Sequence, residues 1–127
     1  MEQALVNHLQ RMEADMSYLQ EQFNLFEQTM HEMKILLESL NELEKNNSQE
    51  LLVNIGRRLY VPVSLKEKSI IVDVGKNTFV KKNIPETKKI IDEQLINLMK
   101  GKGQIMEQMN ALHEEIEQLL NKIESFE

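Results

Sequence analysis

The sequence contains no cysteine and no tryptophan, and it has only four glycines and two prolines among 127 residues. Without cysteine the chain forms neither a disulfide framework nor a thiolate metal site, so a reducing cytoplasm is the expected location. Aromatic residues, at 5%, are too few for a large globular core. The hydrophobic fraction of 41% is nevertheless too high and too regularly spaced for a disordered chain. An elongated helical protein fits both facts.

Long apolar runs are absent as well. No stretch approaches the roughly 18 apolar residues of a membrane span, and the start of the chain, Met1–Leu5, lacks the positive region and apolar run of a signal peptide. We therefore expect a soluble protein with no membrane partner.

The net charge of −6 is unevenly distributed along the chain. Residues 1–46 carry a net charge of −6, residues 47–84 carry +4, and residues 85–127 carry −4. This pattern predicts three parts within a single domain, residues 1–127. Acidic outer segments argue against nucleic acid as a ligand, because neutralising phosphates requires a basic face.

Both outer segments carry a heptad repeat, with apolar residues spaced alternately by four and three. The repeat predicts one continuous helix over residues 1–46 and a second over residues 85–127, where only Lys102 interrupts the apolar seam. Pro85 suits the first turn of the second helix, where its missing N–H group is not needed. The seam residues are Leu5, Leu9, Met12, Met16, Leu19, Phe23, Phe26, Met30, Met33, Leu37 and Leu40, then Ile91, Leu95, Leu98, Ile105, Met109, Leu112, Ile116, Leu119, Ile123 and Phe126.

The two seams match when the helices pair antiparallel. Seam residues whose numbers add to 128, such as Leu9 and Leu119, then face each other, and both ends of the chain meet at the free end of a coiled coil. In this register Lys102 faces Phe26, where its ammonium group can lie over the ring.

The middle segment changes period and predicts two β-hairpins. Gly56-Arg57 suits a two-residue type II′ turn in the first hairpin, and Gly75 to Asn77 suits a longer, bulged loop in the second. Four short strands have little stability alone, and their exposed edges require partner subunits. We predict that eight apolar strand residues hold an oligomer together: Leu51, Val53, Val61, Val63, Ile70, Val72, Val74 and Val80.

The hairpin sequences carry a resemblance to a known family. Residues 52–62, Leu-Val-Asn-Ile-Gly-Arg-Arg-Leu-Tyr-Val-Pro, and residues 71–82, Ile-Val-Asp-Val-Gly-Lys-Asn-Thr-Phe-Val-Lys-Lys, resemble those of the prefoldin α-class subunit, within a helix, two hairpins and a returning helix. One position departs from the family pattern: Asn54 stands where the family usually carries proline. The resemblance implies a mainly α, α+β fold whose hairpins assemble into an intersubunit β-barrel.

The resemblance also implies a function. It implies a hetero-hexamer with prefoldin β-type subunits that captures unfolded polypeptides without ATP or any other cofactor and delivers them to a group II chaperonin. A self-assembling scaffold or filament of prefoldin-like fold remains the alternative, since both need the same barrel and coils. An assay of client aggregation separates the two.

The expected client-binding site is the free end of the coil, where terminal apolar groups lack a neighbour to complete their burial. It comprises Leu5, Val6, Leu9, Leu119, Leu120, Ile123 and Phe126. The off-seam residues Met99 and Met106 are interpreted as a broadened core; the alternative is contact with client chains of varied sequence, for which methionine is adaptable enough.

The sequence gives little support for catalysis or metal binding. His8, His31 and His113 are far apart in sequence, and the carboxylates are spread over solvated helical faces, so we expect neither an enzyme nor a metal site. The one basic cluster either keeps a sheet surface soluble or docks onto an acidic chaperonin rim. It consists of Arg57, Arg58, Lys66, Lys68, Lys76, Lys81 and Lys82.

Overall fold

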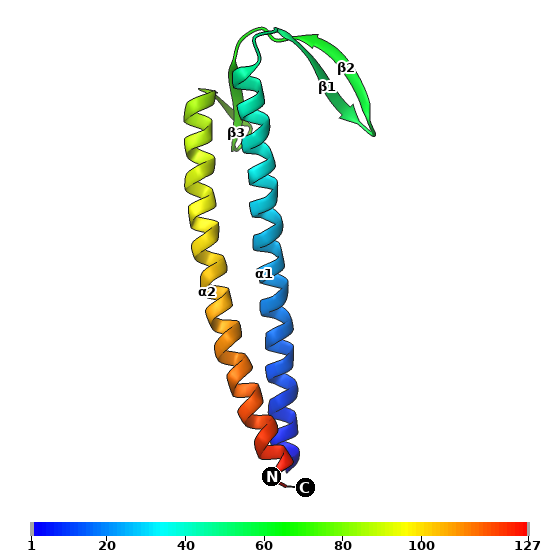
Figure 1. The fold of residues 1–127 in the computed structure, drawn as a ribbon, viewed down its shortest axis with the longest axis vertical. Coiled ribbons are helices and arrows are strands. Elements are labelled where there is room, and N and C mark those ends of the chain that lie inside the picture. Colours follow the sequence, from blue (N-terminus) through cyan, green and yellow to red (C-terminus); the bar gives the residue numbers. More distant parts are fainter. Residues whose placement is uncertain (1, 127) are drawn as a thin grey trace. The chain divides into compact units, whose positions relative to one another are not determined.

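The computed structural model describes residues 2–126; Met1 and Glu127, which we assigned to the two helical segments, lie outside the described residues. The expected mainly α fold with two β-hairpins is confirmed (Figure 1). The elements in chain order are α1 (Glu2–Lys45), β1 (Glu50–Gly56), β2 (Leu59–Ser64), β3 (Ser69–Gly75), β4 (Thr78–Asn83) and α2 (Ile84–Glu124).

The chain divides into two compact units, each containing part of both helices. The terminal unit combines α1 up to Glu32 with α2 from Leu95 onward, and the hairpin unit comprises residues 33–94.

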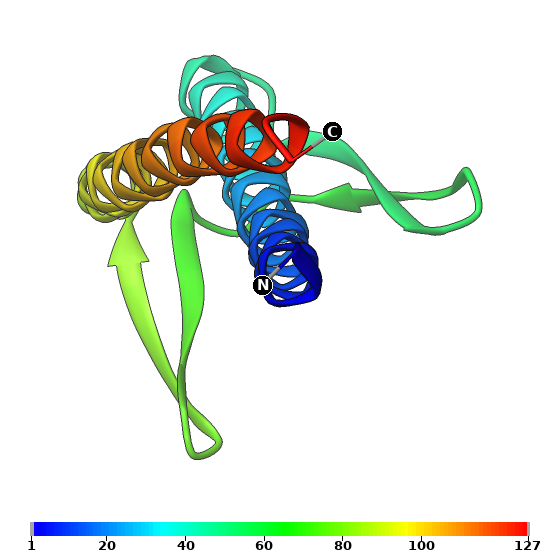
Figure 2. The same cartoon turned by 90° about the horizontal axis from the view of Figure 1, so that it is seen from below.

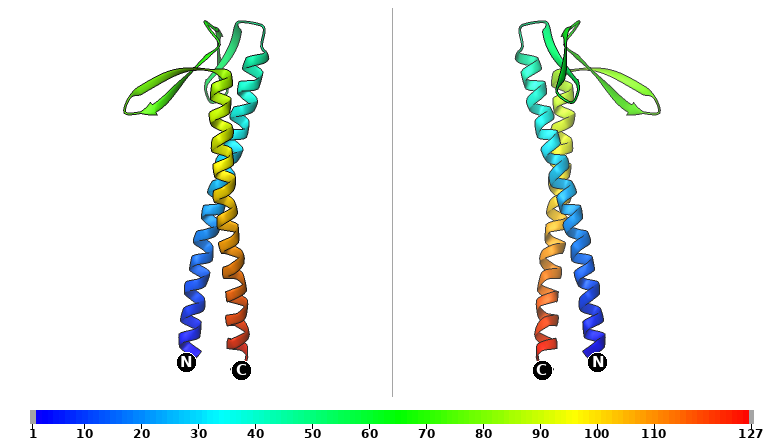
Figure 3. Two further views of the ribbon diagram at one scale, coloured as in Figure 1. Left: turned by 90° about the vertical axis from the view of Figure 1, so that its left-hand side faces the viewer. Right: turned by 90° about the vertical axis from the view of Figure 1, so that its right-hand side faces the viewer.

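The terminal unit is an antiparallel helix pair in which the start of α1 and the end of α2 lie at the same end (Figure 3). Its most buried apolar residues, Met12, Met30 and Leu119, are all predicted seam residues. The heptad repeat therefore identified the side chains that the two helices bury against each other.

The hairpin unit anchors the other ends of the helices. Asn83 caps α2, since its Oδ1 accepts a hydrogen bond of 2.8 Å from the backbone N–H of Glu86. Helix α2 thus begins at Ile84, one residue before the predicted Pro85, because Asn83 serves as the N-cap. Ile84 itself is only 2% exposed, so the start of the helix is also fixed by apolar burial.

Two lysines secure the end of α1 in the same unit. Lys68 Nζ donates a hydrogen bond of 2.9 Å to the backbone carbonyl of Glu44, and Lys88 Nζ lies 2.8 Å from the Glu44 carboxylate. A cation beside the last carbonyls of a helix satisfies an unpaired acceptor and complements the helix dipole. These contacts connect α1 to the linker before β3 and to the first turns of α2.

The hairpins β1-β2 and β3-β4 form two separate antiparallel sheets that extend in different directions within the hairpin unit (Figure 2). Every described strand residue is exposed or half-buried, and none is fully buried. Within residues 2–126, each hairpin is therefore a sheet without a second layer.

The turn predictions for the hairpins need correction. The first loop is Arg57-Arg58, not Gly56-Arg57, and both arginines have positive φ angles, 47° and 65°, as a type I′ turn requires. Gly56 pairs with Leu59 and closes a bulge that begins after Asn54. The bulge is held by Asn54 Oδ1, which accepts a 2.8 Å hydrogen bond from the Gly56 N–H group. This asparagine, at the position where the family usually carries proline, therefore organises the turn.

The second hairpin repeats the same design. Its loop is the two-residue Lys76-Asn77, with φ angles of 54° and 58°, and Asp73 Oδ1 accepts a 2.9 Å hydrogen bond from the Gly75 N–H group. The predicted bulge is present, but it lies between Asp73 and Gly75, so the loop is shorter than predicted. A side-chain acceptor two residues before the glycine produces both turns.

Candidate functional site

The strand register places the predicted assembly residues of the first hairpin on one face. Leu51 pairs with Val63, and Val53 pairs with Val61. These pairs alternate with those of the opposite face, where Leu52 faces Pro62 and Asn54 faces Tyr60. We call the face of Leu51, Val53, Val61 and Val63 the valine face of this hairpin.

The second hairpin follows the same rule. Val72 pairs with Val80, and Ile70 pairs with Lys82, so Ile70, Val72 and Val80 form its valine face. The remaining predicted residue, Val74, lies in the bulge instead of a regular pair and is 57% exposed.

Both faces of both hairpins carry apolar groups without a covering layer. On the valine faces Val53, Val61, Val63 and Val80 are 36% to 42% exposed. The opposite faces are more open and carry large apolar side chains that sequence reasoning did not assign to assembly. These are Leu52, Tyr60, Ile71 and Phe79, which are 54% to 69% exposed. Apolar surface of this extent on two-stranded sheets is typical of an incomplete sheet that pairs with other chains.

The predicted client-binding residues gather at one end of the terminal unit, but they differ in exposure. Leu119 is 6% exposed and belongs to the core, whereas Leu120 is 40% and Phe126 is 54% exposed. The other members are half-buried: Leu5, Val6, Leu9 and Ile123. The structure thus presents Leu120 and Phe126 as the most accessible apolar groups of the predicted set.

The interpretation of Met99 and Met106 as a broadened core is wrong. They are 60% and 45% exposed, because their e position in the heptad points past the edge of the single partner helix. Ile96, at 52% exposed, adds to this apolar stripe on α2.

The predicted partner of Lys102 also needs correction. Gly101, not Lys102, lies against Phe26, since a Cβ atom on Gly101 would stand 2.8 Å from the ring. Lys102 instead places its ammonium 5.1 Å from the centroid of the Phe23 ring and 3.1 Å from a carboxylate oxygen of Glu27. The absence of a side chain at Gly101 gives room to the Phe26 ring, and the lysine moves toward the preceding turn of α1.

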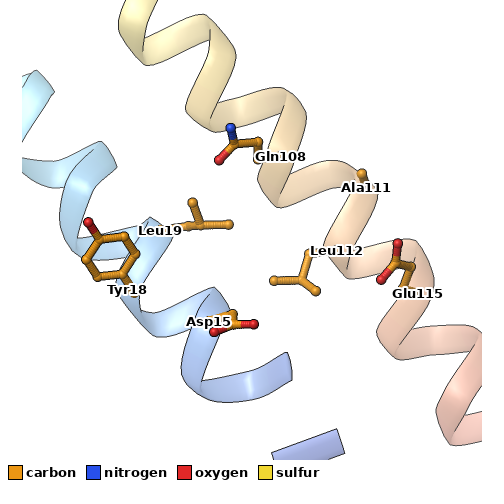
Figure 4. A pocket seen from close by; sticks show the side chains of 7 residues that line it. All are labelled: Asp15, Tyr18, Leu19, Gln108, Ala111, Leu112 and Glu115. Carbon is orange, nitrogen blue, oxygen red and sulfur yellow. The ribbon is translucent and has the colours of Figure 1, made fainter. Parts of the chain in front are cut away.

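A groove runs along one flank of the helix pair in the terminal unit. It has a volume of about 380 Å³, and Leu19 and Leu112 point into the space between the helices at its floor (Figure 4). Its other lining residues are Asp15, Tyr18, Gln108, Ala111 and Glu115. A smaller groove of about 150 Å³ follows, lined by Gln22, Leu25, Phe26, Thr29 and Leu98. Two exposed apolar residues beside these grooves, Tyr18 at 60% and Leu25 at 55%, were not predicted from the sequence as functional. Their spacing of seven residues, at one heptad position outside the seam, could have identified them.

Residues 12–126 of the chain match the protein family described as Prefoldin subunit. The chain belongs to the prefoldin family. Prefoldins are non-enzymatic chaperones that assemble from several prefoldin subunits. Exposed strand faces on a helix pair are the features expected of such a subunit.

Comparison with solved structures agrees on the fold. The chain is similar to a chain of filamentous PFD from Methanocaldococcus jannaschii, with a TM-score of 0.77 and 21% sequence identity over 91% of this chain and 98% of that chain. A comparison with curated protein sequences finds no match.

The basic residues of this prefoldin subunit do not form one cluster with a single role. Lys68 is used at the end of α1, and Lys81 pairs with Glu67, where its ammonium holds the pKa of that carboxyl below its usual range. Arg57, Arg58 and Lys76 lie at the two hairpin turns. The turns therefore carry three of the basic residues, while Lys66 lies in the linker and Lys82 in β4.

The histidines and carboxylates of the described residues lie mainly on exposed helix faces. His113 lies 3.2 Å from Glu117 on the same helix, and residues 2–126 contain no group of three or more side chains suited to hold a metal ion. None of the described helices is long and apolar enough to cross a membrane.

Proposed function

We propose that this chain is an α-class subunit of an ATP-independent prefoldin holdase, which captures unfolded polypeptides and delivers them to a group II chaperonin. The observation that carries the proposal is the pairing of two uncovered hairpins with a helix pair that ends in exposed apolar groups. One part is suited to assembly and the other to client contact. Two hairpins, rather than one, favour the α class, and β-type subunits in a hetero-hexamer are the proposed partners.

Assembly through the valine faces follows from their composition. A β-barrel formed with neighbouring subunits would bury surface that this chain leaves exposed. Full burial of an exposed valine or leucine contributes about 1.5–3 kcal/mol, so valines that are 36% to 42% exposed would each gain less than half of that. The proposed interface residues are Leu51, Val53, Val61, Val63, Ile70, Val72, Val74 and Val80.

Client capture is proposed at the ends of the helices. Leu120 and Phe126 offer exposed apolar surface, and the half-buried groups beside them become accessible when the terminal turns fray. Each contact is weak, but several subunits acting on one client raise the overall affinity through multivalency. The proposed set is Leu5, Val6, Leu9, Leu119, Leu120, Ile123 and Phe126.

The test removes the ends and leaves the body. Deletion of residues 1–9 and 119–127 shortens α1 by roughly two turns and α2 by somewhat less than two turns. The truncated complex should keep its mass, but its suppression of the aggregation of an unfolded client should fall sharply, with or without added nucleotide. A truncated complex that protects as well as the full-length one would overturn the assignment of the ends.

Two double variants separate the loss of apolar surface at the helix ends from the loss of apolar surface elsewhere. Val6→Ser with Leu120→Ser removes two apolar groups at the ends, whereas Ile35→Ser with Leu36→Ser removes two exposed ones elsewhere on α1. Only the first double variant should reduce client protection.

Delivery to a chaperonin is proposed to use the positively charged hairpin turns. Arg57, Arg58 and Lys76 project from the loops and are suited to an acidic surface. Charge reversal at Arg57 and Arg58 should weaken chaperonin binding, most clearly at low salt, and should leave client capture unchanged.

A second function is favoured by one specific observation. One similar solved structure is of a filamentous PFD, so a self-assembling filament or scaffold built through the hairpins is the alternative. Electron microscopy of this chain alone and with a β-type partner separates the two. Filaments without aggregation suppression would favour the scaffold.

A further inference from the structure

The groove on the flank of the terminal unit lies in an unusually acidic stretch of the molecule. Residues 12–33 of α1 and 103–121 of α2 contain nine aspartates and glutamates and no lysine or arginine. Two of these carboxylates, Asp15 and Glu115, line the same groove from opposite helices (Figure 4). Like charges on one flank of a helix pair repel each other and reduce its stability. A cation bound in the groove would relieve that repulsion.

Apart from Asp15, Gln108 and Glu115, the groove is lined by apolar or aromatic side chains. Leu19, Ala111 and Leu112 line it, and the Tyr18 ring is 60% exposed beside them. An aromatic ring next to two carboxylates is suited to a guanidinium group, which stacks on the ring while it pairs with the acids. A purely apolar ligand would leave both carboxylates without a partner.

The second groove extends the site along α1. Leu25 lines it and follows Tyr18 by seven residues, so the two side chains lie about 10 Å apart along α1. In a polyproline II segment, side chains three residues apart point the same way and are separated by about 9 Å. Because unfolded chains populate this conformation extensively, their apolar groups at this spacing match the two grooves.

From these observations we propose that the flank lined by Asp15, Tyr18, Leu25 and Glu115 binds an extended segment of non-native polypeptide in which two apolar side chains are three residues apart and an arginine lies next to them, outside the pair. This inference rests on the proposed function, and it adds a basic-apolar segment class and a site away from the helix ends. The arginine pairs with Asp15 and Glu115, and the apolar groups occupy the two grooves.

The test uses the full-length protein in the assembly it forms. The probe is a fluorescent peptide with an Arg-Leu-Ser-Gly-Leu-Arg centre in a glycine-serine context, which places an arginine outside the apolar pair in either direction of binding. It is compared with the same peptide carrying citrulline in place of both arginines. Citrulline keeps the shape of arginine and removes its charge. The arginine peptide should bind more tightly, and its affinity should fall as salt is raised.

Two double variants of equal charge locate the site. Asp15→Asn with Glu115→Gln should weaken binding of the arginine peptide about threefold to tenfold, the range expected for two partly exposed ion pairs, and should leave the citrulline peptide unaffected. Glu21→Gln with Glu107→Gln, which do not line the groove, should change binding by less than about twofold because distant exposed charges are screened. The groove variant should also melt slightly higher than the parent, because it loses the repulsion between the two helices.

The proposal is overturned if both double variants weaken binding of the arginine peptide equally, since binding would then follow the overall charge. It is also overturned if the groove variant does not weaken binding, since the peptide would then bind another surface. An aggregation assay with a client that lacks basic segments tests the holdase function separately. If the parent protein protects that client while the groove variant binds the arginine peptide normally, only the groove proposal fails. If the parent protects no client but the peptide results hold, the holdase function fails and the peptide site stands.

Discussion

The helix pair and the hairpins are both rich in apolar residues, but they differ in where those residues find partners. Met12, Met30 and Leu119 are buried where α1 and α2 of the same chain pack against each other. Val61, Val72 and Val80, with the same preference for burial, remain exposed or half-buried because each hairpin has two strands and no second layer. The difference indicates that the helix pair can be stable within one chain, whereas the hairpins complete their core only with other subunits.

The largest expected effect comes from charging a valine face. Val72→Asp should abolish assembly, because the carboxylate would be buried without a partner in the joined sheet. The complex should dissociate toward the subunit mass of 14.9 kDa, measured by native mass spectrometry, while the helical signal in circular dichroism persists. Asn54→Asp is the matched control. It adds a charge to the opposite face and preserves the acceptor for Gly56, as Asp73 does in the second hairpin, so it should retain the parent mass. An intact complex with Val72→Asp would show that this face is not the interface.

The pairing of the helices is tested by cross-linking. Cysteines in place of Leu9 and Leu119 should form a disulfide within one chain under mild oxidation, because the seam register places them opposite each other. Cysteines at Leu9 and Leu112, or at Leu9 and Phe126, are offset by one heptad and should remain reduced. Preferential linkage of an offset pair, detected by mass spectrometry after digestion, would refute the register.

Two glycines of α2 test how much the close packing of the two helices contributes to stability. Gly103→Ala meets nothing within 4 Å and should raise the free energy of unfolding by about 1 kcal/mol through helix propensity. Gly101→Ala gains the same propensity but forces the Phe26 ring to move, at about 1–3 kcal/mol, so it should destabilise the protein. Denaturant unfolding of the two variants should therefore shift in opposite directions. A stabilising Gly101→Ala would mean that the ring moves at little cost.

The smallest effect concerns the ion pair of the hairpin unit. Lys81 lowers the pKa of Glu67, so the pair adds stability at pH values above the ordinary glutamate pKa of 4.5, and this contribution disappears as pH falls through the lower folded pKa. Lys81→Gln should raise the Glu67 pKa in an NMR titration. Because the pair is solvent-exposed, its loss should change thermal stability little at neutral pH and not at all in strong acid. An unchanged Glu67 pKa would exclude Lys81 as the cause.

The sequence by itself determined the helices, the seam and the existence of two hairpins. Heptad spacing depends on neighbours within one helix, and strand alternation depends on neighbours within one strand, so both are visible without a fold. Asn54 and Asp73 can be read in the sequence, but their role as hydrogen-bond acceptors for the N–H groups of Gly56 and Gly75 cannot. For this reason the first predicted loop began one residue too early, and the second was one residue too long.

Only the tertiary structure decided which off-seam residues are covered. Met99 and Met106 were expected in a broadened core, yet a single partner helix covers only the seam and leaves the e positions open. The contact of Gly101 with Phe26 and the displacement of Lys102 toward Phe23 depend on how closely two helices approach, and the flank groove depends on residues brought together from α1 and α2. Periodicity assigns a side chain to a face of its own helix, whereas the distance to the facing helix is set by packing between elements remote in sequence.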